Sequence, residues 1–137
     1  MTYSHVSAGG YHTVLLRSDG AAVACGANVH GQCNFPVLEE GAAYIQVSAG
    51  TGHTVLLRSD GTAVACGDNG EGQCSIPVLE EGATYVQVAG GGLHTLLLRS
   101  DGTAVACGDD QSFQCRIPAL EDGVFFVPSS LSAPDLV

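Results

Sequence analysis

The sequence repeats itself at a fixed spacing of 41 residues, and this period limits the fold more than any other feature. Residues 6–46, 47–87 and 88–128 are three consecutive copies, each with the run His-Thr-[Val/Leu]-Leu-Leu-Arg-Ser-Asp-Gly and then Ala-Val-Ala-Cys-Gly. In such arrays each copy is a small structural unit that buries its apolar surface against its neighbours. We therefore predict one repeat domain over residues 1–128 and a C-terminal tail over residues 129–137.

Each copy is expected to consist of short β-strands. The second copy predicts strands over residues 53–58 and 63–66, and a further strand is predicted over residues 85–88, where the second copy passes into the third. Between the first two, Arg58-Ser59-Asp60-Gly61 is a hairpin signal, because Asp can bond the turn backbone and Gly can adopt a positive φ. The strands are apolar on both faces, which indicates sheets stacked face to face. We also expect an edge-type fourth strand near residues 75–79, where Pro77 has no N–H to donate.

The fold class that follows is all-β, with three tandem propeller-blade-like repeats in a partial or open β-propeller. The string Val-Ser-Ala-Gly-x-x-His-Thr-Val-Leu-Leu-x-x-Asp-Gly-x-Ala-Val-Ala-Cys-Gly-x-Asn-x-x-Gly-Gln resembles the repeat of the regulator of chromosome condensation family. That resemblance implies a β-propeller of four-stranded blades. The family includes a nucleotide-exchange factor for a small GTPase, domains of large ubiquitin ligases and a secreted bacterial inhibitor of β-lactamases. The short array is also similar to proteins of algae and protists.

The chain departs from this family in ways that bear on function. Family propellers usually have seven blades, whereas this sequence has three copies, and cysteines replace the family's aromatic residue and leucine. The loop that acts on the GTPase has no counterpart, so the resemblance carries fold and no activity to any residue. Three blades are too few for an ordinary ring. We therefore expect a second copy or another protein to cover the ends, with the partial fourth unit, residues 124–127, protecting one edge.

The charge balance excludes one class of partner. Fourteen acidic residues face four basic ones, and the net charge is −10. Nucleic-acid binding depends on clustered Lys and Arg, so we expect no direct contact with DNA or RNA, and no attraction to anionic membranes. No apolar run is long enough to insert into a membrane, and no signal-peptide pattern opens the sequence. An intracellular or organellar location is favoured, and the compartment stays open.

The histidines that recur in register, His12, His53 and His94, are expected to be structural. A catalytic triad would occur once, whereas these residues and their neighbouring Ser and Asp recur in every copy. We predict that each imidazole hydrogen-bonds backbone in a glycine corner. His5 and His30 lie outside the register and are expected on the surface. The sequence therefore predicts a protein without catalytic residues, cofactor or metal.

The six cysteines leave three alternatives open. They form one Cys-x7-Cys pair in each copy. Structural zinc sites usually have closer cysteine pairs, and a disulfide would need an oxidising compartment. We favour reduced thiols packed as small apolar groups.

Acidic residues also recur, as the pairs Glu39-Glu40, Glu80-Glu81 and Glu121-Asp122. These pairs could bind basic partners or divalent cations, although we favour a solvated loop that maintains solubility. The segment Asp68-Asn69-Gly70-Glu71-Gly72 lacks the ligand spacing of a calcium loop.

Function is expected where the copies differ, because loops of a repeat array can specialise while the framework stays constant. The copies vary just before the repeat histidine and between the two cysteines; drift in unconstrained loops would give the same variation. The candidate partner contacts there are Tyr11, His30, Glu71, Leu93 and Phe113. We expect an acidic, non-catalytic scaffold or accessory subunit that binds protein partners, within a multi-subunit complex or by self-association. The alternative is an inhibitor or regulator of one enzyme or GTPase.

Overall fold

The computed structural model describes residues 1–120, and these form nine antiparallel β-strands in three separate three-stranded sheets. The first sheet contains β1 (Tyr3–Ala8), β2 (His12–Arg17) and β3 (Ala22–Gly26). The second contains β4 (Tyr44–Ala49), β5 (His53–Arg58) and β6 (Ala63–Gly67). The third contains β7 (Tyr85–Gly90), β8 (His94–Arg99) and β9 (Ala104–Gly108). The prediction of an all-β array of blade-like repeats is confirmed.

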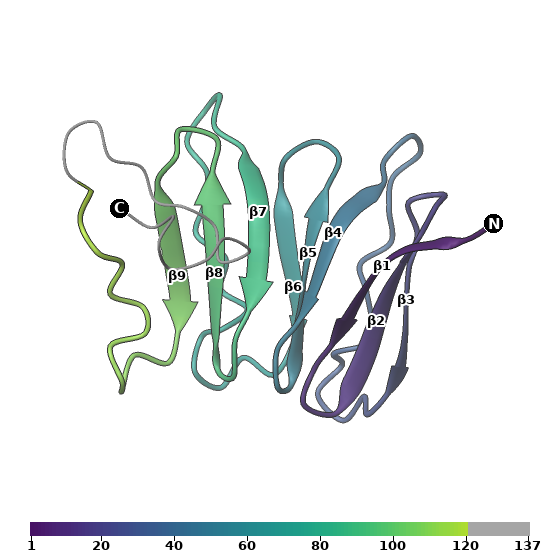
Figure 1. Cartoon of the computed structure of the whole chain (residues 1–137), viewed down its shortest axis with the longest axis horizontal. Coiled ribbons are helices and arrows are strands. Elements are labelled where there is room, and N and C mark those ends of the chain that lie inside the picture. Colours follow the sequence, from purple (N-terminus) through teal and green to yellow (C-terminus); the bar gives the residue numbers. More distant parts are fainter. Residues whose placement is uncertain (121–137) are drawn as a thin grey trace, which may run out of the picture.

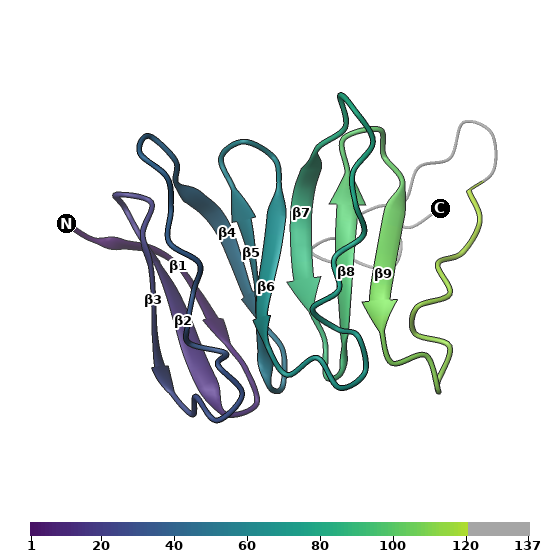
Figure 2. The same cartoon turned by 180° about the vertical axis from the view of Figure 1, so that it is seen from behind.

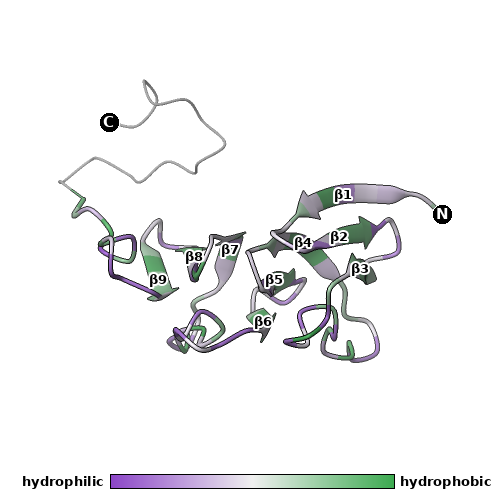
Figure 3. Ribbon diagram, turned by 90° about the horizontal axis from the view of Figure 1, so that it is seen from below, coloured by the Kyte–Doolittle hydropathy of each residue, from purple (hydrophilic) through white to green (hydrophobic). Residues whose placement is uncertain are grey.

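The three sheets follow one another along the long axis of the molecule, with the first and the third at opposite ends (Figures 1 and 2). Figure 3 shows the same order from below, with apolar segments on most strands and both polar and apolar segments in the loops. Strand β4 contacts both β1 and β7, so the first strands of consecutive sheets lie side by side. The described residues contain no helix, and hence none that could cross a membrane.

In each sheet, the hairpin that the sequence predicts joins the second and third strands. In the second sheet the N–H of Gly61 donates to the Arg58 carbonyl at 3.0 Å, and Gly61 has a φ of 85°. The Asp60 carboxylate accepts the N–H of Thr62 at 2.9 Å and its hydroxyl at 2.6 Å. A left-handed glycine after a short turn matches the right-handed twist of the two strands. The Ser-Asp-Gly signal is therefore confirmed.

The core lies between the sheets. The central strand of the second sheet is buried on both faces, as the sequence predicts. In β5, Val55, Leu56 and Leu57 all have no exposed surface. Leu56 packs towards the first sheet with Leu16, whereas Val55 and Leu57 pack towards the third sheet with Leu97. Because successive side chains of a strand point to opposite faces, one strand joins two interfaces.

The expected fourth strand near residues 75–79 is wrong, since this segment pairs with no strand of residues 1–120. Pro77 cannot donate to a ladder, and its carbonyl instead accepts the Tyr85 hydroxyl at 2.6 Å. Ile76 and Leu79 pack against the core between the second and third sheets. The segment therefore fills the space between two sheets. The expected fourth unit at residues 124–127, the end of the third copy and the tail lie outside the described residues.

Candidate functional site: the sheet interfaces and the loop edge

A buried relay of hydrogen bonds joins each sheet to the next. His12 Nε2 lies 2.8 Å from Thr54 Oγ1, and the Thr54 hydroxyl donates to the Gln32 carbonyl at 2.8 Å. The second interface repeats this geometry through His53, Thr95 and Gln73. His53 Nε2 lies 2.9 Å from Thr95 Oγ1, which donates to the Gln73 carbonyl at 2.6 Å. We expected each imidazole to bond the backbone of a glycine corner. His12 and His53 instead bond a threonine hydroxyl of the next repeat.

The relay fixes the tautomer of both histidines. A threonine hydroxyl has one proton, which Thr54 gives to the carbonyl, so Thr54 must accept a proton from His12 Nε2. Burial lowers the pKa of His12 and of His53, and both imidazoles are therefore neutral near pH 7. The third repeat histidine, His94, is half-buried on the outward face of the third sheet. The imidazoles of His12 and His53 act as hydrogen-bond donors between sheets.

The glycine three residues before each repeat histidine is required by space. A methyl group on Gly50 would lie 2.5 Å from His53 Nδ1 and would overlap the carbonyl oxygen of Gly91. A methyl group on Gly9 would lie 2.5 Å from the Gly50 carbonyl oxygen and 2.8 Å from His12 Cε1. The Gly-x-x-His pattern thus lets the imidazole and the next sheet approach the backbone closely.

The six cysteines are free thiols. The second cysteine of each pair bonds its own loop, as when Cys74 Sγ donates to the Asp68 carbonyl at 3.3 Å. The first bonds the preceding repeat, as when Cys66 Sγ lies 3.6 Å from the Gln32 carbonyl oxygen. Burial raises the pKa of Cys66 to about 12 and that of Cys74 to about 11, so both remain protonated. Cys25, in the first of the three described sheets, is exposed.

No metal site is evident at these thiols. Within residues 1–120, no group of three His, Cys, Asp or Glu side chains is placed to hold a metal ion.

All five candidate partner contacts lie along one edge of the array, which we call the loop edge. It consists of residues 9–11, 50–52 and 91–93 with residues 27–34, 68–75 and 109–116, and it runs along the bottom of Figure 1. The structure exposes Tyr11, His30, Glu71, Leu93 and Phe113 there. As expected, His5 is also on the surface, though on β1.

The backbone of the loop edge is held by the framework. A glutamine in each repeat accepts the N–H of the residue two positions earlier, and Gln32 and Gln73 are buried. Gln32 Oε1 accepts from His30, Gln73 Oε1 from Glu71 and Gln114 Oε1 from Ser112, each at 2.9 Å. The carbonyl of Tyr11 accepts the N–H of Ala27 at 2.9 Å, and the carbonyl of Leu93 accepts that of Asp109. The variable residues are therefore fixed through their main chain, while their side chains face solvent.

Phe113 is the most unusual residue of the loop edge. Its φ is 62°, in the left-handed region, whereas the equivalent Gly31 and Gly72 occupy this region without strain. Phe113 is 61% exposed, and the guanidinium carbon of Arg116 lies 4.1 Å from the centroid of its ring. Sequence reasoning missed Arg116, although it too is specific to the third copy. An exposed aromatic in a strained backbone marks this loop as the best candidate for function.

The recurring acidic pairs lie on the opposite edge. Glu39, Glu40, Glu80 and Glu81 are exposed, and they precede turns closed at Gly41 and Gly82, which have φ values of 81°. Glu121-Asp122 lies outside the described residues. The acidic pairs and the loop edge are thus separate surfaces.

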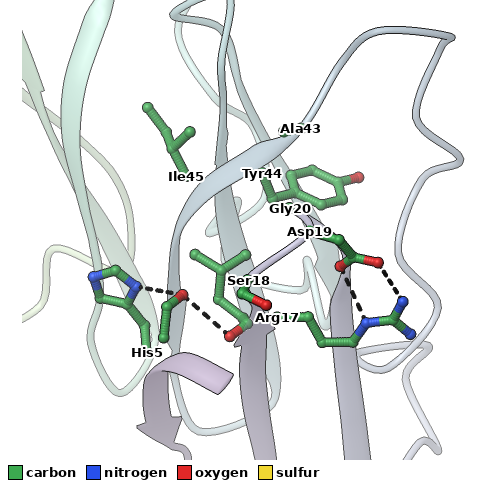
Figure 4. A pocket seen from close by; sticks show the side chains of 10 residues that line it. His5, Arg17, Ser18, Asp19, Gly20, Ala43, Tyr44 and Ile45 are labelled. Carbon is green, nitrogen blue, oxygen red and sulfur yellow. Dashed lines mark hydrogen bonds and ion pairs between the residues drawn. The ribbon is translucent and has the colours of Figure 1, made fainter. Parts of the chain in front are cut away.

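A depression of about 340 Å³ is lined by a histidine, a serine and an aspartate among other residues, and Figure 4 shows His5 and Asp19 on opposite sides of it. His5 Nδ1 lies 3.1 Å from the hydroxyl of its neighbour Ser4. Asp19 is instead paired with Arg17, which holds the pKa of the Asp19 carboxyl below its ordinary value. Because the aspartate does not bond the histidine, these described residues do not form a nucleophile-base-acid chain.

Comparison with solved structures agrees with this architecture. The chain superposes on human WBSCR16 with a TM-score of 0.68 and 23% identity, covering 79% of this chain and 35% of that one. It superposes on Prp20p from Saccharomyces cerevisiae with a TM-score of 0.72 and 23% identity, covering 89% and 34%. The ectodomain of the Arabidopsis thaliana receptor kinase ACR4 gives 0.61 and 18%, covering 92% and 41%. The chain thus spans about a third of the first two proteins, and these similarities show the fold.

The family assignment comes from the sequence repeats. A search of curated protein sequences finds no significant match. The model of the regulator of chromosome condensation (RCC1) repeat matches residues 3–32, 44–73 and 85–114, well over half of the chain. Each match covers one complete sheet and most of the loop that follows it. The chain therefore belongs to the regulator of chromosome condensation repeat family.

Proposed function

We propose that this chain is a non-catalytic protein-interaction module that binds a partner through the loop edge, as an accessory subunit of a larger assembly. One observation carries the proposal. The buried framework fixes the backbone of His30 and Glu71 through a glutamine side chain and leaves their side chains free. Such an arrangement maintains a constant scaffold while the exposed residues determine the specificity.

The exposed residues suit contact with protein. Tyr11 is 71% exposed, Phe113 61% and Leu93 38%. Aromatic residues and arginine are enriched among the residues that dominate binding energy, and Phe113 is stacked with Arg116. Solved structures of the similar Prp20p concern its complex with Kap60 and its binding to Gsp1p and histones. Protein binding by a related propeller supports the same class of function here.

The test is affinity capture from the native source with a variant that copies the second repeat. Tyr11→Gly, Leu93→Gly and Phe113→Gly give the first and third copies the glycines that stand at positions 52 and 72. A matched control, Val37→Ser with Val78→Ser, removes two side chains that are 93% and 92% exposed, away from the loop edge. We expect a stoichiometric partner set with the wild type and the control, and its loss with the triple variant.

Two results would contradict the proposal: capture of no stoichiometric partner, or capture that the triple variant leaves unchanged. The identity of the captured set separates an accessory subunit from the alternative role. Several subunits in fixed ratio support the accessory role, whereas one enzyme or one GTPase supports an inhibitor or regulator.

A further inference from the structure

The two end faces of the array are the two halves of the interface that already occurs twice inside it. The outward face of β2 presents Thr13 and Leu15, which are equivalent to Thr54 and Leu56. The outward face of β8 presents His94, Leu96 and Leu98, equivalent by the repeat to His53, Val55 and Leu57. At both internal interfaces, the threonine and leucine on one sheet pack against the histidine and the aliphatic residues on the facing side of the preceding sheet. The ends are thus complementary to each other.

The first sheet is exposed where its equivalents are buried. Tyr3 is 59% exposed, but the equivalent Tyr44 and Tyr85 are 3% and 2% exposed. Val6 is 72% exposed, whereas the equivalent Val47 is half-buried and Val88 is 6% exposed. An apolar sheet face of this kind is rarely left in water in a stable protein.

The polar groups are complementary as well. Thr13 repeats the threonine that receives the histidine proton, and His94 repeats the histidine that gives it. Cys25 repeats the thiol that bonds the glutamine carbonyl of the preceding sheet, and Gln114 repeats that glutamine. A face that fits the first sheet must therefore supply a histidine donor, a glutamine carbonyl and aliphatic side chains.

We propose that the face of β1–β3 binds the face of β7–β9 of a second copy of this chain, in a head-to-tail contact. His94 of one copy would donate to the Thr13 hydroxyl of the other, and the leucines of both faces would be buried between them. This proposal uses the end faces and is independent of the loop edge. A contact between two different faces also lets chains add in one direction until the array closes.

One difference makes the intermolecular junction weaker than the internal ones. The hydroxyls of Ser7 and Ser48 accept backbone N–H groups of the next sheet, from Ala49 at 2.9 Å and from Gly90 at 2.8 Å. The equivalent residue on the end face is Ala89, which has no acceptor. The junction between copies therefore lacks one hydrogen bond of the internal interface, and it should form and separate reversibly.

The central test uses two variants that each block one face. Leu15→Asp places a charge on the first face and Leu96→Asp places one on the last, and both residues point away from the internal interfaces. Light scattering should show the wild type above 13.9 kDa with a concentration dependence, and each variant alone at 13.9 kDa. An equimolar mixture should form a species of two chains, because one intact face of each kind remains. A mixture that stays at 13.9 kDa would overturn the proposal.

Milder variants keep the test valid if a charged variant fails to fold, which circular dichroism would reveal. Thr13→Val should weaken self-association roughly tenfold, as expected when one buried hydrogen bond is lost. Ala89→Ser should strengthen it several-fold, because it restores the missing acceptor. A wild-type chain that remains monomeric at all concentrations would show that no second copy covers the end faces, and the proposal would fail. An Ala89→Ser variant without effect would also refute the proposed register.

Discussion

Replacing Thr54 by valine tests the relay between the first two sheets. Valine preserves the size and branching of threonine and removes only the hydroxyl. The change leaves the N–H of His12 and the carbonyl of Gln32 without their partner, and both residues are buried, at 4% and 1% exposure. An unsatisfied buried polar group costs about 1–3 kcal/mol. The Cys66 thiol still points at the carbonyl, so we expect a total loss of about 2–3 kcal/mol in the free energy of unfolding.

This loss is large enough to measure against the roughly 5–15 kcal/mol that stabilise a domain. Urea unfolding followed by circular dichroism gives the free energy of unfolding. Thr54→Ser is the matched control, because it keeps the hydroxyl and loses one methyl group, for which about 1 kcal/mol is expected. Thr13→Val, at the same position of the first copy but only half-buried, should change stability by less than about 0.5 kcal/mol in dilute solution. The reasoning is refuted if Thr54→Val is no more destabilising than Thr54→Ser.

Three further predictions concern spacing, protonation and thiol chemistry. Gly50→Ala should destabilise the chain by about 1–3 kcal/mol in urea unfolding, because its methyl group meets the imidazole beside it, whereas Gly70→Ala, at an exposed loop position, should be near neutral. Burial lowers the pKa of His12 and His53 in the folded chain, so the unfolded chain binds protons first. The free energy of unfolding should be flat between the ordinary pKa values of 6.5 for histidine and 9.0 for cysteine, and it should fall as the pH decreases below 6.5. A pH-independent stability between about pH 7 and 5 would contradict this. Under native conditions a maleimide should label Cys25 before the other thiols, as peptide mass spectrometry would show, and uniform labelling would be inconsistent with the structure.

The period and the turn signals predicted most of the fold because these features are local. The hairpin at Asp60 and Gly61 depends on residues adjacent in sequence, and strand burial depends on alternation within a few residues. The fourth strand was wrong, because an extended apolar segment around Pro77 can either pair in a sheet or fill the space beside one. The choice is made by packing that the sequence pattern does not contain.

The relay and the left-handed backbone of Phe113 were missed for two different reasons. His12 and Thr54 are 42 positions apart, and a repeat makes every histidine and threonine look equivalent without saying which pair meets across an interface. The φ of Phe113 had a signal in the sequence, since the two other copies have glycine at this position. Comparison of the copies for backbone requirements, in addition to side-chain type, would have found it.

The glutamine that holds each variable loop defines a simple rule for what can stand there. Gln32 and Gln73 bond the amide N–H of His30 and Glu71 and make no bond to their side chains. Any amino acid except proline offers that N–H, so almost any chemical group can be displayed at residues 30, 71 and 112 without rebuilding the scaffold. A library randomised at these three positions should therefore keep its fold in most members. The array is in this sense a ready framework for engineered binders whose specificity is set one residue per repeat.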